Sequence, residues 1–301
     1  MKISEYKKCT LCHRACGVNR YEKTGFCNMP ADIYVTRAAA HYWEEPPISG
    51  TNGSGTVFFA GCSLGCIFCQ NRDISRGISG QQVSIDQIAN IMLSLEKDGV
   101  HNINFVTPTH YAPSIKLAVK EARDRGLKIP VVYNTGTYDS VETIKALKGT
   151  VNIYLPDLKY YRNETSKKYS RAENYVNKAR EAISEMYNQV GNPVLDENGI
   201  MLSGVIVRIL LLPGHLAEAK LSLKYLVDTY GDKIYVSLMN QYTPMPDMPT
   251  PLNRKVTCSE YNELVEYANK LGLNNGFIQE YGTAEESFIP KFDLTGVNLC
   301  F

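Results

Sequence analysis

Residues 61–69 read Gly-Cys-Ser-Leu-Gly-Cys-Ile-Phe-Cys, and they place three thiols, Cys62, Cys66 and Cys69, in one short loop. The loop directly follows residues 56–60, an apolar run typical of a strand buried on both faces. A closed structural zinc site needs four ligands, and no fourth Cys or His lies nearby in the sequence. Three thiolates on one loop suit a [4Fe–4S] cluster in which one iron lacks a protein ligand. The alternative is three buried thiols without a ligand role.

From residue 51 onward, β-rich runs alternate with helical runs. Capping boxes mark two helix starts, at residues 84–87 and 257–260, and Asp139 with Glu142 marks a third. The β-rich runs, mostly continuous apolar stretches, are residues 56–60, 102–107, 130–135, 151–157, 204–212, 234–240 and 276–281. This alternation predicts an α/β fold with a parallel sheet, either closed toward a barrel or doubly wound.

The composition excludes several classes of protein. The 301 residues include 32 Lys and Arg against 31 Asp and Glu, so the net charge is +1. This near-balance leaves no basic footprint for nucleic acid and no polybasic membrane patch. No apolar run reaches the roughly 18 residues of a membrane span, and residues 1–9 lack the apolar core of a signal peptide. We therefore expect a cytoplasmic protein that binds neither nucleic acid nor membranes.

Nine cysteines are present, and seven of them lie in the first 69 residues. An odd number without a secretion signal argues against a disulfide framework. Four of the seven, Cys9, Cys12, Cys16 and Cys27, precede the loop at 61–69. They are candidates for a second metal site that holds either zinc or a second [4Fe–4S] cluster, or they remain unligated thiols.

The composition and the pattern of the sequence change near residue 50. The Cys-rich part is closed by Pro46-Pro47, and a loop rich in Ser, Gly and Asn follows it. We therefore divide the chain into a small Cys-rich N-terminal extension, residues 1–50, and a main domain, residues 51–301.

The Cys-x3-Cys-x-aromatic-Cys spacing, with Phe68 as the aromatic residue, resembles the signature of radical S-adenosylmethionine (SAM) enzymes. The resemblance covers nearly the whole chain. Residues 44–50, 53–56, 62–75, 156–160, 208–214 and 237–244 are similar to uncharacterised radical SAM proteins related to pyruvate formate-lyase activating enzyme. The resemblance implies a partial (β/α)6 barrel with a [4Fe–4S] cluster on Cys62, Cys66 and Cys69. It also implies reductive cleavage of SAM to a 5′-deoxyadenosyl radical that abstracts hydrogen from a substrate.

The resemblance also suggests what the radical acts on. It implies activation of a glycyl-radical enzyme, with flavodoxin or ferredoxin as the electron donor. One alternative is radical modification of a small molecule, a protein or a peptide. A third interpretation is an iron–sulfur or zinc redox or interaction protein without SAM chemistry, but such a protein would not need polar residues at its strand ends.

Several strand ends carry polar residues, where the active sites of barrels assemble. Thr109 and His110 follow the second strand and are candidate SAM contacts, although a turn with a surface His is the simpler interpretation. Gln241 follows the sixth strand, where an uncharged amide could read adenine or orient substrate. By the resemblance, Phe68 lies near the adenine of SAM.

Charged residues at the strand ends extend this set. Asp157 and Lys159 alternate at the end of the fourth strand and so share a face. By the resemblance, Asn134, Thr135 and Asp157 contribute to a monovalent-cation or SAM site, while Lys159 and Arg208 face the SAM carboxylate or the substrate. The alternative is a structural ion pair that closes the barrel.

Overall fold

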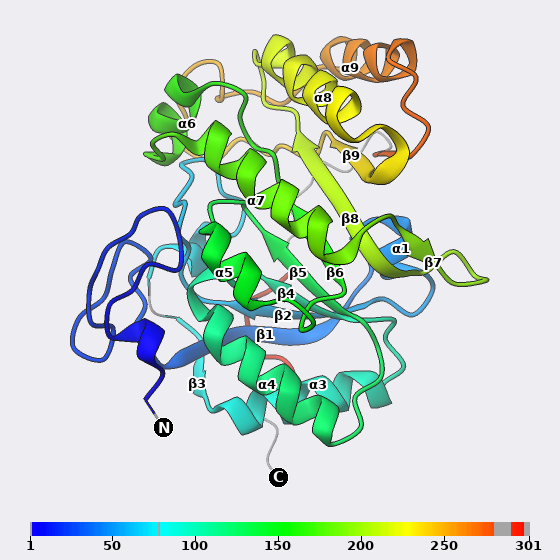
Figure 1. Ribbon diagram of the computed structural model, residues 1–301. Coiled ribbons are helices and arrows are strands. Elements are labelled where there is room, and N and C mark those ends of the chain that lie inside the picture. The colour runs from blue at the N-terminus through cyan, green and yellow to red at the C-terminus, as the bar shows by residue number, and fades with distance from the viewer. Residues whose placement is uncertain (1, 78, 280–289, 298–301) are drawn as a thin grey trace.

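The computed structural model describes residues 2–77, 79–279 and 290–297. Seven parallel strands form the centre of one curved sheet (Figure 1). In chain order they are β2 (Ser54–Phe59), β4 (Ile103–Val106), β5 (Val131–Thr135), β6 (Ile153–Pro156), β8 (Met201–Leu210), β9 (Tyr235–Met239) and β10 (Gly276–Ile278). Each lies within or close to a predicted β-rich run. Residues 280–281 of the last run lie outside the described residues.

The sheet order is β10-β9-β8-β6-β5-β4-β2-β1-β3. Among the described strands, the outermost two, β10 and β3, are not paired with each other, so the sheet is an open barrel. The structure therefore confirms the predicted α/β fold with a parallel sheet. It also agrees with the partial barrel that the resemblance implies. Within the described residues, no helix combines the length and the apolar character that crossing a bilayer requires.

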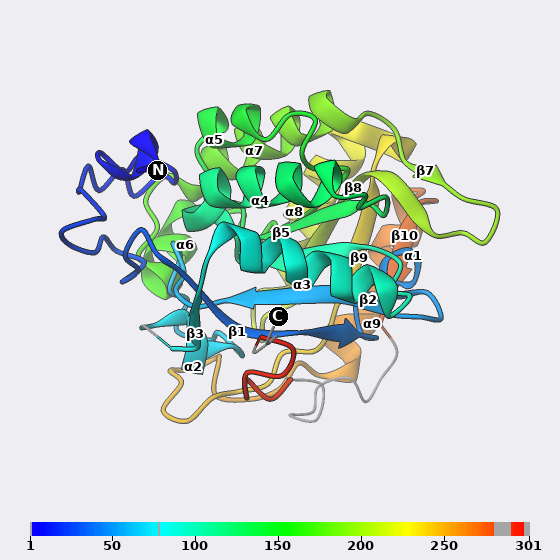
Figure 2. The same ribbon diagram turned by 90° about the horizontal axis from the view of Figure 1, so that it is seen from below.

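Three further strands lie outside the parallel set. β1 (Ile33–His41) pairs antiparallel with β2, and β3 (Gln81–Val83) pairs antiparallel with β1 (Figure 2). β7 (Val194–Leu195) forms a hairpin with β8. β1 was not predicted from the sequence, and its residues fall in the part assigned to the Cys-rich extension. The domain boundary at residue 50 stays a prediction, but β1 is hydrogen-bonded into the main sheet.

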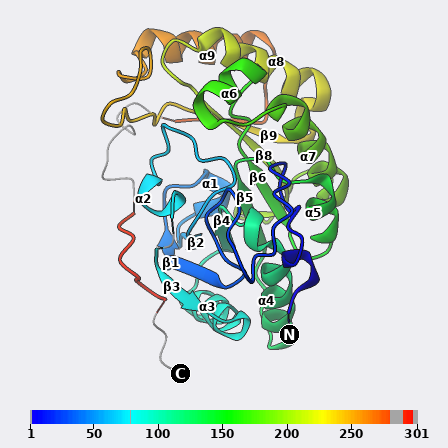
Figure 3. The same ribbon diagram turned by 90° about the vertical axis from the view of Figure 1, so that its left-hand side faces the viewer.

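Helices surround the outer face of the sheet in an arc (Figure 3). The longer ones are α3 (Ile85–Lys97), α4 (Ala112–Asp124), α5 (Val141–Ala146), α6 (Asn163–Ser170), α7 (Tyr175–Val190), α8 (Leu216–Tyr230) and α9 (Cys258–Lys270). The short ones are α1 (Pro46–Ser49), α2 (Arg72–Ser75) and the 3-10 turns η1 (Ser4–Tyr6), η2 (Thr109–Tyr111) and η3 (Gly231–Lys233).

Side-chain caps mark the starts of three described helices, α3, α5 and α9. Both predicted capping boxes form, at the first turns of α3 and α9. The start of α5 differs from the prediction, because Ser140 caps it by accepting from the Thr143 amide. Asp139 instead lies fully buried and accepts hydrogen bonds from the hydroxyls of Tyr133 and Thr135.

Candidate functional site

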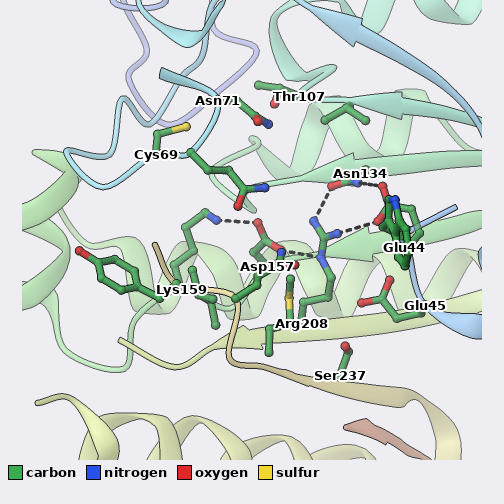
Figure 4. Close-up of a pocket in the computed structure, with 18 of the residues that line it drawn as sticks. Glu44, Glu45, Cys69, Asn71, Thr107, Asn134, Asp157, Lys159, Arg208 and Ser237 are labelled. Carbon is green, nitrogen blue, oxygen red and sulfur yellow. Dashed lines mark hydrogen bonds and ion pairs between the residues drawn. The ribbon is translucent and has the colours of Figure 1, made fainter. Parts of the chain in front are cut away.

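A cavity of about 510 Å³ opens at the carboxyl ends of the parallel strands. Residues at or just beyond the ends of β4, β5, β6, β8, β9 and β10 line it, together with the loop at 61–69 and the segment before α1. In Figure 4, Cys69 lies on one side of the cavity and Glu44 and Glu45 on the other. Because parallel strands end at the same edge of the sheet, residues far apart in sequence meet here.

The three cysteines of residues 61–69 all line this cavity. None of them forms a disulfide. Burial, with the neighbouring thiols of Cys66 and Cys69, raises the pKa of Cys62 to about 12. The free thiol therefore keeps its proton, and ligation of a metal must displace that proton.

The α6 segment supplies hydrogen bonds to the central thiol. The Ser170 hydroxyl donates to Cys66 Sγ at 2.9 Å, and the Tyr160 hydroxyl lies 3.9 Å from the same sulfur. The two hydroxyls also bond to each other. Hydrogen bonds to ligating sulfurs are among the factors that set the reduction potential of an iron–sulfur cluster.

The donor set fits a cluster with three protein ligands. Within the described residues, no three His, Cys, Asp or Glu side chains converge closely enough to hold one metal ion. Cys62, Cys66 and Cys69 nevertheless line one cavity and interact electrostatically with each other. Three thiols spread around a shared cavity are what a cluster with three protein ligands requires.

A network of ion pairs centres on Arg208, whose side chain is only 11% exposed. Its Nε donates to Asp157 Oδ1 at 2.7 Å, one terminal nitrogen donates to Glu44 Oε2 at 3.1 Å, and the other donates to Asn134 Oδ1 at 2.6 Å. All three nitrogens of the guanidinium are therefore engaged by the protein. These contacts form the structural ion pair given as the alternative, while the predicted role of Arg208 toward a SAM carboxylate stays a prediction.

Lys159 extends the network toward the cysteines (Figure 4). Its Nζ donates to Asp157 Oδ2 at 2.6 Å. Burial alone would raise the pKa of Asp157, but Arg208 and Lys159 together hold it below its ordinary value. Burial opposes the charge on Lys159 too, yet the Asp157 carboxylate outweighs that effect, and the pKa of Lys159 is raised. Lys159 is therefore a cation at the cysteine side of the cavity.

Glu44 and Glu45 are site residues that were not predicted from the sequence. Glu44 Oε1 accepts from the side-chain amides of Asn104 and Asn134, at 3.1 and 3.3 Å. Glu45 lines the cavity beside it. Two sequence signals were present: the two acids are adjacent and directly precede Pro46-Pro47, and they belong to the segment 44–50 that resembles radical SAM proteins.

Three of the other predicted SAM contacts line the cavity, namely Phe68, Thr109 and Gln241. Phe68 is held edge-on by the rings of Tyr160, Tyr169 and Tyr242, and Gln241 Oε1 accepts from Gln279.

His110 and Thr135 are not among the lining residues. The His110 ring is buried, with Nε2 against the Ala60 carbonyl at 2.7 Å, and burial lowers its pKa to about 3. The Thr135 hydroxyl donates to Asp139 at 2.6 Å. The geometry supports neither the predicted ligand contacts of these two residues nor a surface position for His110.

The same facts bear on the predicted monovalent-cation site. Its three residues were Asn134, Thr135 and Asp157. The guanidinium of Arg208 contacts both Asn134 and Asp157, and the Thr135 side chain bonds elsewhere. A protein cation therefore already occupies the position between two of the three predicted ligands, and the geometry does not support a metal cation there.

The N-terminal cysteines gather beside the loop at 61–69. Cys9, Cys16 and Cys27 each affect the pKa of Cys12, which burial raises to about 12. Arg14 anchors this segment, because it donates to the carbonyls of Ser63 and Leu64 at 2.9 and 3.1 Å. The four predicted ligands thus lie in one lobe that packs against the cluster loop, while the ligand they hold stays a prediction.

A comparison with protein-family models identifies the family of this chain. The model described as "Radical SAM superfamily" matches residues 56–219, which include the three-cysteine loop and the strand ends from β4 to β8. The chain belongs to the radical SAM superfamily. Membership implies SAM-dependent radical chemistry with a [4Fe–4S] cluster and SAM, in agreement with the donor set of the cavity.

Individual relatives add the extent of the similarity. This radical SAM chain is 30% identical over 286 residues to an uncharacterised protein of Methanocaldococcus jannaschii. The aligned region covers 89% of this chain and 76% of that protein. Among solved structures, the FeFe-hydrogenase maturase HydG from Carboxydothermus hydrogenoformans matches with a TM-score of 0.51 and 13% identity over 76% of this chain. Streptococcus suis SuiB bound to S-adenosylmethionine matches with a TM-score of 0.49 and 13% identity over 74% of this chain. The chain spans about half the length of these two structures, 54% and 49%. At 13% identity, the likeness to HydG concerns the fold alone.

The double variant Cys12→Ser and Cys16→Ser tests the N-terminal lobe. We expect it to lose the metal of the lobe and to unfold the lobe at lower denaturant, because the segment has only a small apolar core around Tyr6, Cys9 and Leu11. Metal analysis of anaerobically purified wild type and variant identifies the metal of the lobe. The variant should lose about one zinc per chain if the lobe binds zinc, or about four irons per chain if it binds a cluster. The absorbance of the cluster at residues 62–69 should stay unchanged. Equal metal content in variant and wild type would show that these thiols are unligated.

Proposed function

We propose that this radical SAM protein activates a glycyl-radical enzyme by abstracting a hydrogen atom from a backbone glycine of that partner. The observation that carries the proposal is the rim of the cavity. Tyr42, Trp43 and Ile278 line the cavity and are 55%, 61% and 52% exposed. Large exposed apolar side chains around a cavity favour a macromolecular partner, one segment of which enters the cavity.

Each group of residues in the cavity has a separate role in this proposal. Cys62, Cys66 and Cys69 would hold the [4Fe–4S] cluster, and Phe68 would pack near the adenine of SAM. Lys159 would face the SAM carboxylate, because it is the lining cation on the cysteine side. When bound, the reduced cluster and SAM supply a 5′-deoxyadenosyl radical and methionine at the expense of one electron. The surrounding barrel keeps water away from the reaction.

Anaerobic assays test this proposal. Reconstituted protein with dithionite and SAM should form 5′-deoxyadenosine, and flavodoxin or ferredoxin should replace dithionite. Addition of a glycyl-radical enzyme encoded beside this chain's gene should produce a glycyl radical in electron paramagnetic resonance spectra. If that enzyme carries deuterated glycine, deuterium should appear in 5′-deoxyadenosine.

Two other outcomes would contradict the proposal. Formation of 5′-deoxyadenosine without a glycyl radical would favour modification of a small molecule, a protein or a peptide. No 5′-deoxyadenosine at all, from protein with an intact reduced cluster and bound SAM, would favour a redox protein.

A further inference from the structure

One buried carboxylate oxygen in the cavity has no partner among the described residues. Glu45 is 8% exposed, and its Oε2 accepts no hydrogen bond from any residue that the structure describes. Glu45 lines the cavity, on the side away from Cys69 (Figure 4). Leaving a buried carboxylate oxygen unpaired is costly, so such a group in a cavity points to a ligand.

The backbone holds this carboxylate in place. Glu45 caps α1, and its carbonyl accepts from the amides of Ile48 and Ser49 at 2.8 and 3.0 Å. Ile48 is fully buried in a cluster beneath β5, β6 and β8. These bonds fix the backbone from which the Glu45 side chain extends into the cavity.

The charges around Glu45 identify what could pair with it. Among the described lining residues, three carboxylates (Glu44, Glu45 and Asp157) face two cations, Lys159 and Arg208. The three guanidinium nitrogens of Arg208 donate hydrogen bonds to Asp157, Glu44 and Asn134. Lys159 forms an ion pair with Asp157. Among the described lining residues, Glu45 is the carboxyl group that neither cation hydrogen-bonds.

The lining histidine does not compensate for this charge, because burial lowers the pKa of His41 to about 4. Burial also raises the pKa of Glu45, and Glu44 adds to that effect while Arg208 opposes it. Charge on Glu45 is therefore unfavourable until a cation joins it. Ser237 lies on β9 opposite Arg208 and supplies a hydroxyl beside the carboxylate.

We propose that Glu45 forms the floor of a subsite for a protonated primary amine of the substrate. The inference rests on the proposed radical chemistry in this cavity and deepens it by naming the substrate class. The amine belongs either to a small molecule or to a lysine side chain of an entering peptide. Because Glu45 lies across the cavity from Cys69, this subsite would orient the substrate rather than SAM.

Binding measurements on cluster-reconstituted protein test the subsite without any turnover. Pentylamine should bind about tenfold more tightly than 1-pentanol, a neutral molecule of similar shape, at millimolar concentrations in titration calorimetry. Glu45→Gln should remove that preference, and Glu45→Asp, which keeps the charge, should retain part of it. Glu266→Gln, at an exposed position of α9, is the matched control and should behave as wild type. The blocked peptide N-acetyl-Ala-Lys-Ala-amide, in which the lysine side chain supplies the amine, is compared with pentylamine to distinguish the two sources.

Three results would overturn the inference. Wild type that binds both probes equally, or neither, has no cation subsite. A Glu45→Gln variant with undiminished preference for pentylamine places the recognition elsewhere. A Glu45→Gln variant that loses affinity for SAM to the same extent assigns Glu45 to the SAM site. Since none of these measurements requires SAM cleavage, failure of the subsite and failure of the proposed activity are distinguishable.

Discussion

Replacing Cys62, Cys66 and Cys69 together by alanine should abolish both cluster binding and formation of 5′-deoxyadenosine. The three thiols line one cavity, and no other described cysteine lines it. Without them the cluster has no protein ligands, so the variant should lose about four irons and four sulfides per chain after anaerobic reconstitution. Iron and sulfide analysis and chromatography of the reaction products provide the measurements.

The matched control is Cys258→Ala, because Cys258 is exposed at the start of α9. It should keep the iron content and the activity of wild type. Any metal in the N-terminal lobe should also remain in the triple variant, which separates the two groups of thiols. A triple variant with the iron and sulfide content of wild type would refute the assignment of the three ligands.

Arg208→Met should lower the free energy of unfolding by about 3–5 kcal/mol, because it removes the cation shared by two carboxylates that are only 10% and 19% exposed. Asp157 and Glu44 would keep their burial but lose bonds of 2.7 and 3.1 Å to the guanidinium. Urea unfolding monitored by circular dichroism gives the difference. The surface control Arg125→Met, which breaks an exposed ion pair with Asp86, should change stability by less than about 1 kcal/mol.

The loss in free energy of unfolding caused by Arg208→Met should depend on pH. In wild type the pKa of Asp157 is lowered, so its ionisation stabilises the fold above the unfolded-state pKa, and this contribution disappears as the pH falls through the folded-state pKa. In the variant, Asp157 keeps only Lys159 as a cation, and Glu44 ionises against burial without an ion-pair partner as the pH rises. The difference from wild type should therefore be largest near neutral pH and shrink in acid. Adding Glu44→Gln, which removes the carboxylate left without a cation, should recover part of the stability. A deficit that is equal at all pH values would contradict this explanation.

Much of the fold follows from local patterns. The parallel strands appear as continuous apolar runs because both of their faces are buried, and a capping box needs only residues three positions apart. β1 could not be predicted in this way, since an antiparallel strand that carries Arg37 and His41 lacks such a run. Similarly, Asp139 looked like a helix cap, but it is a buried acceptor for Tyr133 and Thr135.

The sequence by itself determined the donor set of the site. Three cysteines within residues 62–69 are held together by the covalent chain, so their spacing predicts shared ligation whatever the fold. Polar residues at predicted strand ends were also identifiable, because parallel strands end at one edge of the sheet. The alignment of Asn134, Asp157, Lys159 and Arg208 along the cavity agrees with that expectation.

Only the tertiary structure decided what those residues contact. Arg208 and Glu44 are 164 positions apart, and their pairing depends on where α1 packs beneath the sheet. The direction of a side chain at a strand end is equally non-local: His110 and Thr135 turn to Ala60 and Asp139 rather than to the cavity. A buried charge must find its partner wherever the chain brings one, and that position follows from the packing of the whole molecule rather than from neighbours in sequence.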